Sequence, residues 1–252
     1  MTQLLAIITL HMEDKKIFKT NFLKKEKMGN ITYSFYFKKN RKFNFAPGQY
    51  IRLMLDIKKP DERGTRRYFT VSSSPTEKEY FTITTKIIKS TFKKALFRLK
   101  KGQEVSFIGP IGYFDINLKN KNPKVFLAGG IGITPFHSSL TFLDDKKIKQ
   151  EITFIVTFSK KEDVIFLEEL KKIESKNKLI KIVVSLTGED INYPNFEKGR
   201  IDKNMIKKYV HNIKKSKYFI TGPLSFVQDT ENLLKEIGIR EINIFKEDFS
   251  GY

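Results

Sequence analysis

The sequence predicts two consecutive units, an antiparallel β-barrel followed by an α/β unit built on a parallel sheet. In the first half, short β-rich stretches are separated by turn residues such as Pro47-Gly48 and Lys101-Gly102, a spacing typical of small barrels. In the second half, strand-like and helix-like segments alternate, which is typical of a parallel sheet covered by helices. The pattern changes near the Lys/Asn-rich stretch Asn117–Asn122, so we expect domains over 1–118 and 119–252.

In the first half, five stretches are rich in β-branched and aromatic residues. They are 31–37, 50–57, 68–72, 80–88 and 104–108. An amphipathic helix is expected over 91–99, with Ser90 or Thr91 as its cap, because the apolar side chains fall on one helical face. The apolar stretch 4–10 indicates a further strand, since it is too short to span a bilayer and lacks the basic start of a secretory signal.

In the second half, the expected strands and helices follow in strict alternation. The strands are 125–128, 152–158, 179–186, 218–221 and 242–245, and the helices begin at 135 or cover 164–173, 203–209 and 226–237. The glycine-rich turn 129–132 joins the first of these strands to the first helix, for which Thr134 is a good N-cap and Pro135 a good first residue. A helix that begins at such a turn favours a pyrophosphate.

The composition excludes several kinds of chemistry and leaves two kinds of partner open. The chain has no cysteine, so disulfides, thiolate metal sites and a cysteine nucleophile are excluded. Its three histidines are scattered and predict no metal site. The net charge of +20 suits an acidic protein or an anionic cofactor. A nucleic-acid partner is the alternative, but no compact basic run is interleaved with aromatic residues.

The run 67–75 combines an arginine, aromatic rings and hydroxyls on one predicted strand. Alternation places Arg67 and Phe69 on one face of this strand. Tyr68 and Thr70 then occupy the opposite face. An arginine can hold a phosphate through two parallel hydrogen bonds, and an aromatic ring can stack on a planar ligand. The alternative is an ordinary strand that ends in a serine turn.

Taken together, six motifs in this chain resemble those of the ferredoxin–NADP reductase superfamily, in the same order. They are Pro47-Gly48-Gln49-Tyr50, Arg67 to Pro75, Gly109 to Phe114, Gly129 to Pro135, Thr221-Gly222-Pro223 and Glu247 to Tyr252. The resemblance covers nearly the whole chain. It implies a flavin-binding antiparallel barrel followed by a parallel-sheet nucleotide-binding domain, with FAD favoured over FMN and with NADPH or NADH as substrate.

In the barrel, the resemblance implies roles for residues of three segments. Arg67 would pair with a flavin phosphate, Phe69 would pack against the isoalloxazine, and Thr70 would act near flavin N5. Further cofactor contacts are implied for Tyr68, Thr85, Lys86, Ser90, Thr91, Phe92 and Lys93. The segment that opens the helix lacks the glycine often found in the family, which leaves the choice between FAD and FMN open.

In the second half, the resemblance implies nucleotide contacts and, together with Thr70 of the barrel, a group of catalytic residues. The nucleotide contacts are Gly130, Gly132, Thr134, Ser159, Lys160, Gly222 and Pro223, and the catalytic group is Thr70, Thr221, Glu247 and Phe249. Ser159 and Lys160 follow the second strand, where a hydroxyl and a lysine favour the 2′-phosphate of NADPH. Phe249 and Tyr252 would cover the flavin. Many relatives carry cysteine where this chain has Thr221.

The implied activity is that of an NAD(P)H-dependent flavin oxidoreductase. Hydride would pass from the nicotinamide to flavin N5, with Glu247 or Asp248 assisting charge or proton balance. An acidic ferredoxin or flavodoxin is the expected acceptor, and a ferric chelate or a membrane partner is the alternative. We expect a cytoplasmic protein. The non-enzyme alternative is a basic nucleic-acid-binding protein.

Overall fold

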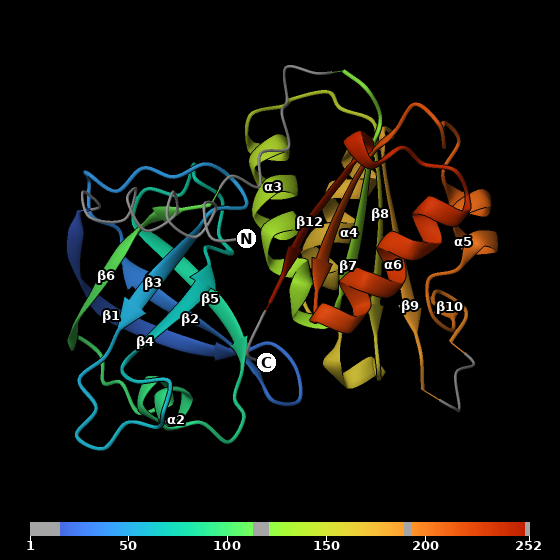
Figure 1. Cartoon of the computed structure of the whole chain (residues 1–252). Coiled ribbons are helices and arrows are strands. Elements are labelled where there is room, and N and C mark those ends of the chain that lie inside the picture. The colour runs from blue at the N-terminus through green and yellow to red at the C-terminus, as the bar shows by residue number, and fades with distance from the viewer. Residues whose placement is uncertain (1–15, 113–120, 189–192, 250–252) are drawn as a thin grey trace.

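The computed structural model describes residues 16–112, 121–188 and 193–249 (Figure 1). Two six-stranded sheets lie side by side, one antiparallel and one parallel, as the sequence predicts. The expected strand within 4–10, the expected domain boundary at 118/119 and Tyr252 all fall outside the described residues.

The first sheet forms a barrel whose strand order is β4-β3-β6-β1-β2-β5. Its strands are β1 (Ile17–Lys27), β2 (Thr32–Lys38), β3 (Tyr50–Met54), β4 (Arg66–Thr70), β5 (Tyr80–Lys86) and β6 (Glu104–Ile111). Just beyond β4, Val71 pairs with Ile83 of β5, and this bridge brings the two edge strands of the sheet together. Strand β1 was not predicted, although Phe18, Thr20 and Phe22 are buried at alternate positions.

Phenylalanine fills the barrel interior. Side chains of alternate residues on β2 and β5, including Phe35, Phe37 and Phe81, are fully buried there, and each contributes roughly 2–3 kcal/mol by leaving water. Helix α2 (Thr91–Phe97) adds Phe92 and Leu96 to the same core. The residues between those positions point outward, so β2 and β5 present a second, polar face to the rest of the molecule.

The second sheet is parallel and has the order β10-β9-β8-β7-β11-β12. Its strands are β7 (Lys124–Gly129), β8 (Ile152–Phe158), β9 (Ile180–Leu186), β10 (Glu197–Lys198), β11 (Lys217–Gly222) and β12 (Ile244–Asp248). From β7 the chain moves outward to β10 and then returns to β11 on the other side of β7. The carboxyl ends of β7 and β11 therefore form the switch point at which open α/β sheets bind ligands.

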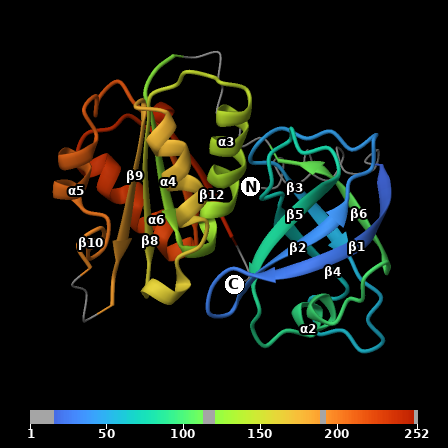
Figure 2. The same cartoon turned by 180° about the vertical axis from the view of Figure 1, so that it is seen from behind.

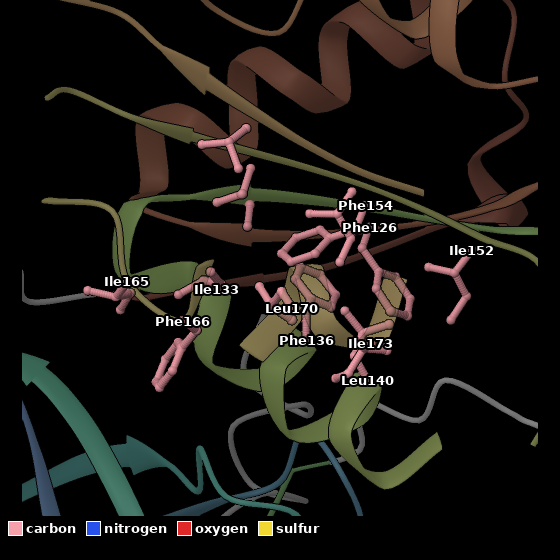
Figure 3. Packing of buried hydrophobic residues seen from close by; sticks show 14 of the residues in the cluster. Phe126, Ile133, Phe136, Leu140, Ile152, Phe154, Ile165, Phe166, Leu170 and Ile173 are labelled. Atoms are coloured by element: carbon pink, nitrogen blue, oxygen red, sulfur yellow. The ribbon is translucent and has the colours of Figure 1, made fainter. Parts of the chain in front are cut away.

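Helices cover both faces of this sheet. They are α3 (Ile133–Asp145), α4 (Leu167–Lys176), α5 (Lys203–Tyr209) and α6 (Leu224–Glu236). Helices α3 and α4 pack on one face, where Phe126, Phe136 and Phe154 form the centre of an apolar cluster (Figure 3). Helices α5 and α6 pack on the opposite face.

Helix α3 also faces the barrel, and both views show it between the barrel and the rest of the second domain (Figures 1 and 2). Its His137 ring nitrogen Nδ1 lies 2.7 Å from the Ser72 carbonyl oxygen, and the Ser138 hydroxyl donates to the Ser73 carbonyl at 2.6 Å. A further backbone hydrogen bond links the Asn30 amide to Glu162. These contacts fix the second domain against the segment that follows β4.

The start of α3 differs from the prediction. The glycine turn Gly130–Gly132 is a 3₁₀ turn that continues directly into the helix at Ile133, because Gly132 already has helical dihedral angles. Thr134 is therefore not the N-cap, and its hydroxyl instead donates to the Ile131 carbonyl at 3.1 Å. Pro135 is the third helical residue. The first N–H groups of a helix have no partner within it, so the missing N–H of proline costs no hydrogen bond at this position.

The beginning of α4 also differs, lying three residues later than expected. The cause is Phe166, whose left-handed backbone (φ 61°) breaks the helix and stacks the ring on His137 with centroids 3.8 Å apart. Nothing in the apolar pattern of 164–173 indicates this break, because it depends on a contact with another helix.

We predict that Gly132→Ala destabilises the fold by on the order of 2–3 kcal/mol. A Cβ at this position would lie 2.7 Å from the carbonyl carbon of Thr221, in backbone that cannot move aside easily. Gly64→Ala is the control, since it has positive φ but open space around it and should cost only about 1 kcal/mol. Chemical denaturation measures both, and equal losses would contradict the close approach.

Candidate active site between the two domains

A cleft of about 690 Å³ opens where the barrel meets the second domain. Its lining residues are Tyr50, Tyr68, Phe69, Thr70, Thr84, Thr134, Glu247, Asp248 and Phe249. The first five come from barrel strands, one comes from α3, and the last three come from the end of β12 and the residue after it. We call this the central cleft. It brings together Thr70, Glu247 and Phe249, which the sequence predicted to be catalytic.

The strand that carries the arginine motif alternates as predicted. Tyr68 is half exposed at the mouth of the central cleft, with its ring edge-on to Tyr50 at 5.6 Å between centroids. Thr70 is paired in register with Tyr50, so both reach the same region. Phe69 is buried, and its ring lies 5.9 Å from that of Phe92 in the barrel core. Phe69 thus serves the core and also borders the cleft.

Arg67 lies outside the lining of the central cleft, beside the start of α2. Its Nη2 donates to Asp61 Oδ1 at 2.6 Å, and its guanidinium lies 5.2 Å from the centre of the Phe92 ring. The Asp61 carboxylate also accepts from the Thr91 amide, and the hydrogen bonds from Thr91 and Arg67 hold its pKa below the usual range. Arg67 Nε is buried and has no partner among the described residues.

Positive charge is concentrated around this arginine. Lys93 is buried in the first turn of α2, where burial together with Arg63, Arg67 and Lys86 lowers its pKa to about 7. Ser90 is the N-cap of the helix and accepts from the Lys93 amide at 3.4 Å. A bound anion would relieve the repulsion among these cations.

Thr85 does not line the central cleft, nor the second cleft that lies at the switch point of the parallel sheet. It is fully buried in the barrel, and its hydroxyl has no hydrogen-bond partner within the described chain. Phe92 likewise is a core residue with no exposed surface. The sequence placed both near the cofactor because they belong to segments that surround it, but their own side chains point into the barrel.

Glu247 stands at the end of β12, in register with Thr221 of the neighbouring strand. Its Oε2 atom is buried and lacks a hydrogen-bond partner in the described part of the molecule. Burial, with a smaller effect from the Asp248 carboxylate, raises the pKa of Glu247 to about 7. Glu247 is therefore ready to gain or lose a proton near neutral pH.

A second cleft lies at the switch point of the parallel sheet, and we call it the nucleotide cleft. Its lining residues include Lys86, Gly129, Gly130, Ile131, Thr157, Ser159, Thr187, Arg200, Pro223, Ser225, Phe226 and Asp229. Gly130 has positive φ and open space around it, and a Cβ added there would have only Lys86 Nζ within 4 Å. Lys86 thus crosses from the barrel to the glycine turn, whereas Lys160 is exposed outside this cleft.

Gly132 and Gly222 lie where the packing leaves no room for a side chain. A side chain at Gly132 would strike the backbone of Thr221 and Gly222, and one at Gly222 would strike the Phe226 ring. The Thr221 hydroxyl donates to the Gly132 carbonyl and so ties the two loops together. Thr221 is fully buried and lines neither cleft. Its predicted place beside the nicotinamide therefore corresponds here to a structural hydrogen bond.

Several residues at these clefts were not predicted as site residues. They include Tyr50 and Thr84 at the central cleft and Thr157, Arg200 and Phe226 at the nucleotide cleft. Thr84 could have been found from Thr82 and Thr84, which are polar at alternate positions of a strand. Arg200 and Phe226 carry no such signal, because only the return of the chain to β11 brings them to the glycine turn.

Two family models match successive parts of the chain. An oxidoreductase FAD-binding domain matches residues 20–116, and an oxidoreductase NAD-binding domain matches residues 126–232. The chain belongs to the oxidoreductases that join an FAD-binding domain to an NAD-binding domain. The predicted combination of a flavin-binding barrel and a nucleotide-binding parallel sheet is thereby confirmed.

Similar proteins include flavohemoprotein A of Dictyostelium discoideum, which is 29% identical over 242 residues. A glycine betaine monooxygenase reductase subunit of Pseudomonas aeruginosa is 27% identical over 211 residues. These alignments cover 90% and 82% of this chain, but only 58% and 57% of the relatives. A ferredoxin NADP+ reductase from Neisseria gonorrhoeae with bound FAD and NADP shares the fold, with a TM-score of 0.78 at 19% identity, covering 92% of this chain and 98% of that one.

The residues of the central cleft fit a flavin. Two rings at its mouth, Tyr50 and Tyr68, offer aromatic surface. Outside the cleft lining, beside the start of α2, the buried Arg67 Nε is a donor without a protein partner among the described residues. In the nucleotide cleft, the open cradle at Gly130 and the buried hydroxyl of Thr157, which no described residue satisfies, fit a phosphorylated nucleotide. Among the described residues, no helix is long and apolar enough to cross a membrane.

We predict that Glu247→Gln removes a pH dependence of stability. The pKa of Glu247 rises from 4.5 to about 7 on folding, so the folded state binds more protons between these values. The free energy of unfolding of the unaltered protein therefore falls as pH rises through this window, by on the order of 3 kcal/mol.

Glutamine stays neutral, so Glu247→Gln should lack this fall and should be the more stable protein at pH 8. Glu236→Gln, at an exposed position on α6, is the control. Urea denaturation at several pH values measures the effect. Parallel pH profiles for Glu247→Gln and the unaltered protein would show that Glu247 titrates normally.

Proposed function

We propose that this chain oxidises NADPH or NADH by hydride transfer to FAD and then passes electrons to an acceptor. One observation carries the proposal: a single turn borders both clefts. Gly130 and Ile131 line the nucleotide cleft, while Thr134, at the start of α3, lines the central cleft. A dinucleotide held at the glycine turn thus has a direct way into the cleft that fits a flavin.

The chain's own residues would bind and orient the flavin and the nucleotide, and they would exclude water. The flavin would supply the capacity to accept a hydride and release single electrons. Arg67 would hold the flavin phosphate, and Tyr50 and Tyr68 would contact its ring system. The Thr70 hydroxyl would donate a hydrogen bond to the flavin from the cleft wall. Glu247, with its pKa near 7, would hold or release a proton beside the site of transfer.

Phe249 is proposed to cover the flavin until the nicotinamide enters. Its amide donates to the Gly222 carbonyl at 2.9 Å, which fixes the end of β12 next to the nucleotide cleft. Its side chain borders the central cleft and packs against the core of the second domain. This position lets a small movement of one residue open or close the cleft.

Ser159 and Arg200 support NADPH as the preferred donor, because both line the nucleotide cleft near the end of β8. Arg200 is exposed and lies 3.8 Å from Asp229, so its guanidinium can turn toward a phosphate. Lys160, which lies outside the cleft, is proposed to contribute positive charge from a greater distance.

The acceptor is proposed to be an acidic electron-transfer protein such as a ferredoxin or flavodoxin. The net charge of +20 supports this choice, since complementary charge speeds the encounter of such partners. A ferric chelate or a membrane partner remains the alternative acceptor. The name of one relative, a glycine betaine monooxygenase reductase subunit, likewise describes a component of a larger system.

The purified protein should bind FAD and show flavin absorbance that NADPH bleaches without oxygen, more efficiently than NADH. Titration with FAD and anaerobic mixing with each nucleotide provide the measurement. A colourless protein that takes up no added flavin and binds nucleic acid in a salt-sensitive manner would contradict the proposal and favour the nucleic-acid alternative.

We predict that Arg67→Gln weakens FAD binding by on the order of tenfold or more, because it removes a charge-assisted hydrogen bond to phosphate. The neighbouring Arg66→Gln is the matched control, since Arg66 is exposed on the opposite side of the same strand. Quenching of FAD fluorescence measures both dissociation constants. Equal affinities for the two variants would remove Arg67 from the flavin site.

We predict that Lys86→Gln raises the dissociation constant of NADP+ on the FAD-loaded protein by on the order of tenfold. Lys86 is the barrel residue that reaches the glycine turn, so its loss removes a cation from the nucleotide cleft. Lys89→Gln, at an exposed site nearby, should bind NADP+ normally. If Lys86→Gln instead weakened FAD and left NADP+ unchanged, Lys86 would belong to the flavin site.

A further inference from the structure

The outer face of the barrel carries a connected row of buried hydroxyls at the domain junction. The Thr84 hydroxyl lies 2.7 Å from that of Ser34 and 2.8 Å from that of Ser72. The Ser72 hydroxyl in turn lies 2.8 Å from that of Thr82. All four side chains are at least nine-tenths buried. We call these four residues the hydroxyl row.

The hydroxyl row joins two cavities. Thr84 lines the central cleft. Ser34 and Thr82 line a third cleft of about 1060 Å³ between the domains, which we call the junction cleft. Its other polar lining residues include Tyr36, Glu77, Tyr80, His137, Asp145 and Glu169. Two hydrogen-bonded routes therefore lead from Thr84 to the junction cleft, one through Ser34 directly and one through Ser72 and Thr82.

A hydroxyl can accept one hydrogen bond while it donates another, so a connected row can pass a proton along by successive transfers. Buried hydroxyls must be paired to be tolerated, whereas valine or alanine would pack at these positions without that requirement. The opposite face of the same strands is filled by Phe35, Phe37 and Ile83, which shows that these strands readily accommodate apolar side chains.

The junction cleft gives the row an outlet to solvent. His137 Nε2 lies 2.7 Å from Glu169 Oε2, and the Glu169 side chain is 59% exposed. The hydrogen bond from His137 keeps the pKa of Glu169 below its usual range. An ionised, solvent-exposed carboxylate thus stands at the cleft into which Ser34 and Thr82 open.

We propose that the hydroxyl row conducts protons from the central cleft to the junction cleft. The proposal rests on the proposed reductase activity. One NADPH and two one-electron acceptors give NADP+, two reduced acceptors and one proton, so each turnover must release one proton from the central cleft. Thr84 would accept that proton and pass its own to Ser34 or Ser72, and water in the junction cleft would receive it.

Stopped-flow mixing of the FAD-loaded protein with NADPH and ferricyanide, a one-electron acceptor, tests this proposal. Flavin absorbance follows electron transfer, and a pH-indicator dye in weak buffer follows proton release. The Ser34→Ala/Ser72→Ala double variant cuts both routes and leaves Thr84 in place at the central cleft. We expect its proton release to lag behind electron transfer by at least about tenfold.

Each single variant, Ser34→Ala or Ser72→Ala, leaves one route and should lag much less. Thr32→Val is the matched control, because it removes another buried hydroxyl from β2 that lies outside the row. Hydroxyl-proton exchange, measured by NMR on the FAD-loaded protein without NADPH, gives a readout independent of turnover. The Thr84 hydroxyl proton should exchange more slowly in the double variant.

Proton release that keeps pace with electron transfer in the double variant would overturn the proposal and assign the proton to Glu247 or Tyr50. If the double variant does not fold, Thr84→Val, which interrupts both routes at their common point, gives the same test. Failure of NADPH to bleach the flavin in the unaltered protein would instead disprove the proposed function.

Discussion

The contact between α3 and the segment after β4 is the constraint on which the three clefts depend. His137 and Ser138 bind the carbonyl groups of Ser72 and Ser73, so the two domains meet at the strand that carries the arginine motif. This contact places Thr134 opposite Thr70 across the central cleft. His137 and Ser73 of this contact also line the junction cleft. A shift of α3 would therefore change both the central cleft and the junction cleft.

The charged groups around the clefts differ, and each arrangement suits a different step of the proposed reductase reaction. Arg63, Arg67 and Lys86 lower the pKa of Lys93, so positive charge exceeds negative charge beside the Arg67–Asp61 pair, which favours a phosphate there. In the central cleft, burial raises the pKa of Glu247 to about 7, so near neutral pH it carries less negative charge toward an incoming nucleotide than an ordinary carboxylate would. The Glu169 carboxylate at the junction cleft is exposed and paired with His137, as suits exchange with water.

The sequence predicted the two sheets and most of the residues that line the central cleft, because local patterns determine both. Alternation placed Thr70 and Tyr68 correctly, and the glycine turn located Gly130. The failures have tertiary causes. Thr134 lost its capping role because Gly132 is already helical. The close approach of Gly132 and Thr221 was not predicted, because it is a contact between two loops far apart in sequence.

A crystal structure of the protein with FAD tests the central claim most directly, namely that the cleft between the domains is the site of flavin chemistry. The isoalloxazine ring should lie in the central cleft, in contact with Thr70 and Thr84 and within reach of Glu247, with the phosphates at Arg67. A flavin bound at another surface, with the central cleft still empty, would contradict the claim.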